Sequence, residues 1–393
     1  AMANPSLIIF AALFFAACSS CSGGTGASAD GGGATGPDLL RTEAGLSRRG
    51  DNPHGKTFYV RPGGGTAAQC TGQADKDYPG KGSGQACAFS HPFIALPPGG
   101  GKALLSGGDW MIIADGSYRM GINAPGTSRC EKASTYDCDM PPIPAGPAKD
   151  KPTRILGAGW DSGCKTRPQL YGVERAWRVL DLTNSSNLEI NCLEITDHSG
   201  CVEDHSGGLS CKRSGNGPYG DWSPTGIYAQ DAANVTLKKV DIHGMAHHGI
   251  LGGRLRDWTF EDVRIAANGW VGFDGDLGSN VKDSANNGTL LFRRVVIAWN
   301  GCGETYPGKK PQGCWGQEAG GYGDGLGTAS TGGDWIFEDC RFTHNVSDGL
   351  DLLYHERGGK IVIKRCHAEG NAGNQIKVSG KDLTIQNSVM VGN

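Results

Sequence analysis

Two stretches near the end of the chain decide the fold: residues 334–345 read DWIFEDCRFTHN, and residues 360–371 read KIVIKRCHAEGN. In the first, Phe337 is followed by an apolar residue three positions later and by another two positions after that. The second repeats this spacing from Ile363, which lies 363 − 337 = 26 residues further along the chain. Because successive side chains of a strand point to opposite faces, the step of three predicts two short strands separated by a bend.

The same spacing runs through the second half of the chain. It starts again at other apolar residues, namely Ile190, Leu237, Phe260, Phe292 and Ile385. The shortest steps are 260 − 237 = 23 and 385 − 363 = 22 residues. A glycine–apolar pair then opens a third strand in most units, at Gly226, Gly249, Gly272, Gly325 and Gly349. Three short strands in each unit predict an all-β, right-handed parallel β-helix, whereas a propeller needs about 40–50 residues per blade.

Composition excludes several other classes. Glycine supplies 65 of the 393 residues, well above the usual ~7%, but it shows no triplet period that would indicate collagen. The 9 tryptophans and the many other apolar residues argue against a disordered chain. A net charge of 37 − 40 = −3 leaves no basic excess for phosphates, so we expect no nucleic-acid partner. Frequent glycine also disfavours a helix bundle, because each interior glycine costs a helix about 1 kcal/mol relative to alanine.

The N-terminus has the pattern of an export signal. Leu7–Ala17 is an unbroken apolar run of eleven residues, which is too short to span a bilayer and fits the core of a secretory leader. Residues 15–18 resemble a bacterial lipobox, which makes Cys18 a candidate lipid anchor and the only expected contact with a membrane. An ordinary secretory leader and a retained hydrophobic segment are the alternatives. We expect an extracellular or cell-surface protein, most simply an outer-membrane lipoprotein.

Three segments follow from these features. They are a leader over residues 1–18, a flexible Gly/Ser-rich tether over 19–55 and a β-helix domain over 56–393. The last repeat unit stops at Asn393 without a capping signal, although repeat arrays need end caps. Either the β-helix continues beyond this sequence, or self-association covers its C-terminal coil.

Cysteine usage indicates an oxidising compartment. Of the 14 cysteines, Cys18 and Cys21 fall in the leader and the tether, and the even number that remains favours disulfides over metal sites. Four pairs are close in sequence and should each staple a loop insertion: Cys70/Cys87, Cys130/Cys138, Cys201/Cys211 and Cys302/Cys314. Cys340 and Cys366 occupy equivalent positions one coil apart, so they should stack or form a bridge.

The repeat register predicts which polar residues meet. Equivalent positions in successive coils lie about 4.8 Å apart. Alignment on Phe273, Leu326, Leu350 and Ile376 places Asp274, Asp351 and Lys377 in one row, with Asp324 and Asp348 two residues before their own apolar positions. Three carboxylates on one surface repel one another unless a cation joins them, and an all-oxygen site suits Ca²⁺. Lys377 beside them is a candidate general base, and Asp274 is a candidate sugar contact.

Here the chain resembles polysaccharide lyase family 9, the β-helix pectate lyases. The resemblance is carried by residues 347–352 (SDGLDL), 373–380 (GNQIKVSG) and 383–393 (LTIQNSVMVGN), with more general features from Phe58 onward. It implies that Lys377 is the catalytic base and that Asp324, Asp348 and Asp351 bind Ca²⁺. The implied reaction is β-elimination on an acidic, pectate-like polysaccharide. The family motif normally begins with Asp where Ser347 stands, which implies weaker calcium binding or a water ligand there, and leaves Ser347 as a substrate-binding candidate.

Other interpretations of the same residues remain open. The aspartates are able to serve only as acceptors for backbone amides in turns. The chain then becomes a noncatalytic β-helix: a surface protein, adhesin or filament subunit. A glycoside hydrolase would use Asp348 and Asp351 as its carboxylic-acid pair and would leave Lys377 without a role. We expect His243, His247 and His248 to have structural or substrate-contact roles rather than to bind a metal, because adjacent residues in a strand point to opposite faces.

Overall fold

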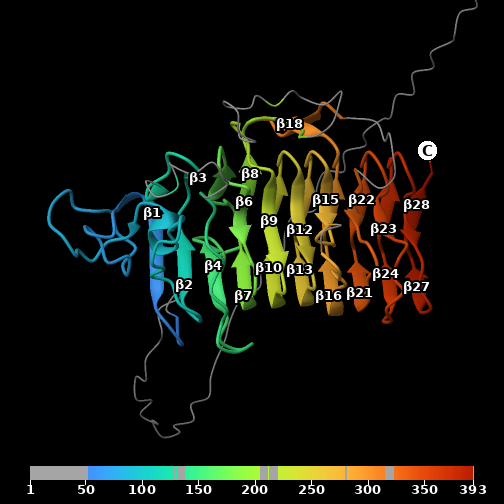
Figure 1. Ribbon diagram of the computed structural model, residues 1–393, viewed down its shortest axis with the longest axis horizontal. Helices are drawn as coiled ribbons and strands as arrows, with labels where there is room; N and C mark the ends of the chain where they lie inside the picture. The colour runs from blue at the N-terminus through green and yellow to red at the C-terminus, as the bar shows by residue number, and fades with distance from the viewer. Residues whose placement is uncertain are drawn as a thin grey trace, which may run out of the picture. The chain divides into compact units, whose positions relative to one another are not determined.

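The computed structural model describes residues 52–127, 130, 138–203, 211, 220–278, 281–314 and 323–392. Over these residues the chain winds as a parallel β-helix with three long sheets, which Figure 1 shows as successive coils from blue to red. The fold prediction is therefore confirmed. The leader, Cys18, Cys21 and most of the tether lie outside the described residues. In the part of the chain that is described, no helix has the length and hydrophobicity of a membrane span.

Most coils contribute one strand to each sheet. The first sheet contains β1 (Thr57–Gly65), β2 (Trp110–Ile113), β4 (Thr153–Gly157), β7 (Ser186–Asn191), β10 (Ala233–Lys238), β13 (Arg256–Glu261), β16 (Asn287–Arg293), β21 (Asp334–Glu338), β24 (Ile361–Lys364) and β27 (Leu383–Gln386). The second contains β3 (Ser117–Met120), β5 (Gln169–Gly172), β8 (Glu194–Asp197), β11 (Asp241–His243), β14 (Arg264–Ala266), β17 (Val296–Ala298), β22 (Arg341–Thr343), β25 (His367–Glu369) and β28 (Val389–Val391).

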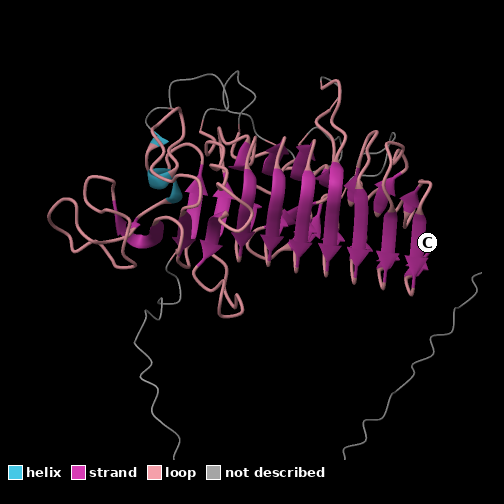
Figure 2. Cartoon of the chain, turned by 90° about the horizontal axis from the view of Figure 1, so that it is seen from below, coloured by secondary structure: helices cyan, strands magenta, loops and turns pink. Residues whose placement is uncertain are grey.

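The third sheet is shorter and carries the candidate site. It contains β6 (Arg178–Asp181), β9 (Thr225–Gln230), β12 (His248–Gly253), β15 (Val271–Asp274), β20 (Leu326–Gly327), β23 (Leu350–Leu352) and β26 (Lys377–Val378). Outside the three sheets lie a four-residue helix, α1 (Pro92–Ala95), and a hairpin of β18 (Gly303–Thr305) and β19 (Lys310–Gln312). Figure 2 shows the strands lying side by side from coil to coil, with α1 near the N-terminal coils.

The repeated apolar residues form the core, as the spacing predicts, except in the last coil, where Ile385 is 46% exposed. Phe260, Phe292 and Phe337 pair in register and stack, with ring centroids 4.3 and 4.8 Å apart. Burial of each aromatic ring stabilises the fold by roughly 1.5–3 kcal/mol. The step of three between strands comes from one residue in the left-handed region, such as Asp339 at φ 57° or Arg365 at φ 52°. That residue turns the chain from the first sheet into the second.

A ladder of buried asparagines supports the turn into the third sheet. The side-chain amides of Asn268, Asn300 and Asn345 each donate to the asparagine of the next coil at 2.8–3.0 Å, and Asn371 is the last acceptor. They pack so closely against the next strand that a Cβ on Gly349 would lie 2.6 Å from Asn371 Nδ2 and 2.5 Å from the Gln375 carbonyl oxygen. Glycine is therefore required at this position by close approach.

All four predicted loop disulfides are present. The bonds join Cys70 to Cys87, Cys130 to Cys138, Cys201 to Cys211 and Cys302 to Cys314. A fifth bond, Cys164–Cys192, spans 28 residues and was not expected from the spacing. Cys340 and Cys366 are buried free thiols in contact with each other, so these two stack without a bridge. Five disulfides fit an extracellular or periplasmic compartment.

Candidate active site

The strand register brings the predicted polar row together on the outer face of the third sheet. Asp274 pairs with Gly327, Gly327 with Asp351, and Asp351 with Lys377 in successive coils. Asp324 and Asp348 lie just before β20 and β23. The residues that the repeat predicts to be neighbours in successive coils are therefore neighbours in the structure.

Asp324, Asp348 and Asp351 form a compact, buried group, here called the carboxylate cluster. One carboxylate oxygen from each lies within 4.8 Å of those from the other two. Lys377 Nζ donates to Asp351 Oδ2 at 2.7 Å and to Asp348 Oδ2 at 3.1 Å. The lysine side chain is 32% exposed, whereas the two aspartate side chains are only 5% and 11% exposed. Lys377 is therefore more exposed than the two carboxylates that it contacts.

Backbone amides hold each carboxylate by one oxygen. Asp324 Oδ1 accepts from the Asp348 amide at 2.9 Å, and Asp351 Oδ1 accepts from the Leu353 amide at 2.9 Å. Asp348 Oδ1 accepts from both the backbone and the side-chain nitrogen of Asn374, at 2.5 and 2.9 Å. These aspartates thus accept hydrogen bonds from amides in turns, as one interpretation expected. That role does not account for all of their contacts, because the Oδ2 atoms of Asp348 and Asp351 accept from the lysine. A loop anchor alone does not need this second set of contacts.

The charges of the cluster depend on one another. Burial, reinforced by the neighbouring Asp348 and Asp351 carboxylates, raises the pKa of Asp324 to about 7, against hydrogen bonds that favour its ionised form. For Lys377, burial works to lower the pKa, but the hydrogen bonds that it donates to Asp351 and Asp348 raise the pKa well above the usual range. The cluster without a metal therefore holds a lysine ammonium as counter-ion and a carboxyl group that is partly protonated near neutral pH.

The cluster has the chemistry and the size of a calcium site. Calcium binds oxygen ligands at 2.3–2.6 Å, so two oxygens on one ion lie at most about 5 Å apart. The carboxylate oxygens, which lie within 4.8 Å of one another, meet that limit. Ser347 is fully buried next to Asp348, and its hydroxyl lowers the pKa of Asp324, so it faces the cluster without adding a charge. A fourth carboxylate is absent at that position.

A cavity of about 230 Å³ opens beside the cluster, over Gly327. Gly327 keeps it open, because a Cβ there would lie 2.9 Å from Asp324 Oδ2. Asp274 lines the far side, and His248 Nε2 lies 3.5 Å from its carboxylate. The repeat did not identify three further lining residues: Trp270, Asp276 and Tyr354. Trp270 lies in the turn before β15, and Tyr354 lies in the turn after β23. Their being aromatic residues in loops is the feature of the sequence that could have identified them.

The three histidines have two different environments. His247 and His248 contact each other, with their Nδ1 atoms 2.7 Å apart, so the expectation that they point to opposite faces is wrong. The reason is that His247 lies in the turn before β12 rather than inside a strand. The His247 ring also packs on Trp270, with centroids 4.1 Å apart. These two histidines therefore border the cavity wall.

His243 lies elsewhere, in a buried charged group that sequence reasoning missed. Its Nε2 lies 2.9 Å from Glu194 Oε1, its Nδ1 bonds Glu304 Oε1, and Lys309 Nζ reaches Glu194 at 2.8 Å. We call these four residues the His243 cluster. Glu304 and Lys309 belong to the β18–β19 hairpin region seen above the coils in Figure 1, so the cluster attaches this insertion to the second sheet.

Comparison with known proteins adds a likeness of fold. No protein-family model matches the sequence, and neither does any curated protein. Similar solved structures include pectate lyase Pel9A, with 14% identity, coverage of 87% of this chain and 79% of that chain, and a TM-score of 0.45. A pectin methylesterase from Aspergillus niger shares 10% identity over 79% of this chain and 85% of its own, with a TM-score of 0.39. An alginate lyase from Paenibacillus sp. shares 11% over 72% and 92%, with a TM-score of 0.34.

Proposed function

We propose that the chain is an exported, calcium-dependent polysaccharide lyase that cleaves an acidic, pectate-like polymer by β-elimination. The observation that supports this most directly is the contact of Lys377 Nζ with both Asp348 and Asp351 at the edge of the three-carboxylate cluster. The sequence resemblance to polysaccharide lyase family 9 points to the same residues. The five disulfides agree with export.

Asp324, Asp348 and Asp351 are the residues that would hold calcium. When bound, the ion supplies positive charge next to a uronate carboxylate of the substrate, which makes the proton on C5 of that sugar more acidic. The Oδ1 atoms, held by amides, would keep the three carboxylates in place when such a cation takes the position of the lysine ammonium.

Lys377 is placed to remove the C5 proton. In its neutral form Nζ accepts this proton, the electron pair of the C5–H bond forms the C4–C5 double bond, and the bond from C4 to the glycosidic oxygen breaks. The departing oxygen takes a proton from solvent, and the new end is an unsaturated uronate. Asp274 and the aromatic residues around the cavity contact neighbouring sugars. An alkaline optimum follows, because the base has to be neutral and a cation on Asp348 and Asp351 would replace the contacts that raise the pKa of Lys377.

A noncatalytic β-helix, acting as a surface or adhesive protein, is the second candidate. It is favoured by the ion pairs of Lys377, since a lysine held between two carboxylates also serves as a purely structural bridge. The two candidates differ in one respect that can be measured, which is whether polymer is cleaved.

The test is incubation of the protein with polygalacturonate, with Ca²⁺ or with EDTA, from neutral to alkaline pH. We expect ultraviolet absorbance from the unsaturated product with Ca²⁺ and none with EDTA. New reducing ends without that absorbance would instead indicate the hydrolase. Unchanged polymer length under every condition would leave the noncatalytic protein.

A further inference from the structure

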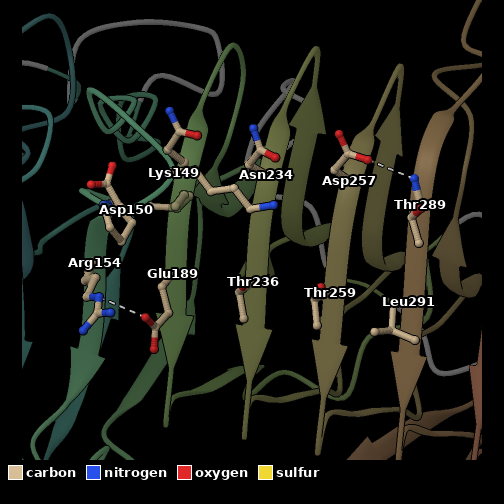
Figure 3. Close-up of a pocket in the computed structure, with 13 residues that line it drawn as sticks. Lys149, Asp150, Arg154, Glu189, Asn234, Thr236, Asp257, Thr259, Thr289 and Leu291 are labelled. Atoms are coloured by element: carbon tan, nitrogen blue, oxygen red, sulfur yellow. Dashed lines mark hydrogen bonds and ion pairs between the residues drawn. The ribbon is translucent and has the colours of Figure 1, made fainter.

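A second hollow lies on a different sheet from the carboxylate cluster. It is a groove of about 480 Å³ on the outer face of the first sheet, and it crosses five successive coils from β4 to β16. The loop formed by residues 149–152 closes one end (Figure 3). The proposed reaction uses none of its residues, and Leu188 is the one lining residue that also belongs to the core.

The floor of the groove is a row of outward-facing side chains in strict register. Arg154, Glu189, Thr236, Thr259 and Leu291 pair from coil to coil and are drawn as one line in Figure 3. Successive members are about 4.8 Å apart. The centre of the floor therefore consists of two threonine side chains followed by Leu291.

One edge of the groove is a second row of polar side chains. Asn187, Asn234 and Asp257 occupy equivalent positions at the starts of their strands, in the left-handed region at φ 53°, 53° and 58°. Asn and Asp tolerate this conformation better than other side chains do. Asp257 Oδ1 accepts from the Thr289 amide at 3.0 Å, which fixes this edge. Amide and carboxylate groups thus line the floor along its length.

The charges that line the groove nearly cancel, because Lys149 and Arg154 stand against Asp150, Glu189 and Asp257. Arg154 Nε lies 2.9 Å from Glu189 Oε2 inside it. The neighbouring outward row continues this pairing, with Lys238 bonded to Glu261 at 3.0 Å and Arg293 to Glu338 at 3.2 Å. Paired charges of opposite sign leave little field to attract a polyanion. The groove therefore differs from the carboxylate cluster, where three acidic residues face one lysine.

We propose that this groove binds an uncharged linear polysaccharide lying along the coil axis. Sugar rings have apolar C–H faces and hydroxyl edges, which match a floor of threonine methyl groups and Leu291 bordered by hydrogen-bonding side chains. The coil spacing is of the same order as the length of one sugar, so successive residues of an extended chain meet equivalent side chains. The groove holds a neutral polymer and does not require the proposed lyase activity.

Affinity electrophoresis of the full chain in EDTA tests this, with hydroxyethylcellulose, xylan or galactan in the gel and polygalacturonate in a parallel gel. We expect at least one neutral polymer, and not polygalacturonate, to retard the protein. Thr259→Arg places a long charged side chain on the middle of the floor and should weaken this retardation at least tenfold, and Thr236→Arg should do the same one coil away. Thr384→Arg is the matched control, since Thr384 lies in the same row but outside the groove.

Three results would overturn the proposal. One is that no neutral polymer retards the wild type. Another is that both Thr259→Arg and Thr236→Arg bind as the wild type does while Thr384→Arg also binds unchanged. The third is retardation by polygalacturonate in EDTA that Thr259→Arg abolishes, which would contradict the neutral ligand. Circular dichroism of the variants confirms folding, and the β-elimination assay reports on the proposed function separately.

Discussion

Two outer faces of the same β-helix carry their charged residues in different arrangements. On the third sheet, Asp324, Asp348 and Asp351 gather around Lys377, so acidic groups outnumber the base. On the first sheet, charged side chains in and beside the groove pair with opposite charges in the next coil, as Arg154 does with Glu189 and Lys238 with Glu261. Both faces have the same spacing between coils. The scaffold therefore sets distances, and the residues of single rows decide whether a face is suited to a cation and a polyanion or to a neutral ligand.

Replacement of Lys377 should have the largest effect on the difference between the two faces. Lys377→Ala removes the proposed base and should lower the β-elimination rate roughly 10²–10⁴-fold, because a positioned general base contributes that much. The measurement is the initial rate of ultraviolet absorbance with polygalacturonate and Ca²⁺. Lys364→Ala, a lysine change on the first sheet, should keep the wild-type rate. An unchanged rate in Lys377→Ala would refute the site assignment.

A fourth carboxylate, added to the cluster at residue 347, should increase the difference in charge between the two faces. Ser347 is fully buried, so Ser347→Asp should destabilise the protein in EDTA by about 3 kcal/mol, the order expected for an uncompensated buried charge. Ca²⁺ should restore most of the loss by engaging the new carboxylate. Thermal unfolding with EDTA and with Ca²⁺ measures both effects, and Ser347→Asn is the uncharged control. An equal loss under both conditions would show that no cation binds beside residue 347.

The His243 cluster tests whether a balanced charged group affects only stability. Burial alone would lower the pKa of His243, but hydrogen bonds with Glu194 and Glu304 raise it. Its contribution is therefore fully present below the ordinary histidine pKa of about 6.5 and is lost as pH rises through the raised value. Burial opposes ionisation of Glu194, yet hydrogen bonds from His243 and Lys309 lower its pKa to about 2, so its contribution is lost only in acid.

His243→Gln should cost about 2–3 kcal/mol near pH 6 and flatten the fall in melting temperature at alkaline pH. The charges that face His243 are Glu194 and Asp241 from the coils and Glu304 from the insertion, with Lys309 beside Glu194. Melting temperatures across the pH range measure the effect, and His54→Gln at an exposed position is the control. Identical pH profiles for His243→Gln and the wild type would count against the cluster as the pH-sensitive group.

The smallest expected effect is on the groove. Glu189→Gln leaves Arg154 without its 2.9 Å partner and gives the floor a net positive charge. We expect a few-fold gain in polygalacturonate binding in EDTA at low salt, since one partly exposed charge is worth up to about 1 kcal/mol. Affinity electrophoresis at two salt concentrations measures it. No gain at low salt would show that charge balance does not govern what this face binds.

Much of the site follows from local spacing, and the rest depends on long connections. Asp351 and Lys377 were predicted to be neighbours because the repeat register converts sequence distance into coil position. Glu304 meets His243 across 61 residues through an irregular insertion, and Cys164 meets Cys192 across 28, so no period relates either pair. His247 was expected inside a strand, but it lies in the turn before β12. The groove could not be predicted, because it depends on the position of the loop at residues 149–152, which the repeat does not determine.

The most direct test of the central claim is the mass of the oligomers released from polygalacturonate in ¹⁸O-labelled water. Elimination by Lys377 adds no water across the broken bond, so each new fragment pair should together lack one water molecule relative to hydrolysis products and carry no label. Products that contain the added water and the ¹⁸O label would contradict a lyase. A polymer that stays intact with Ca²⁺ at every pH would contradict any cleavage.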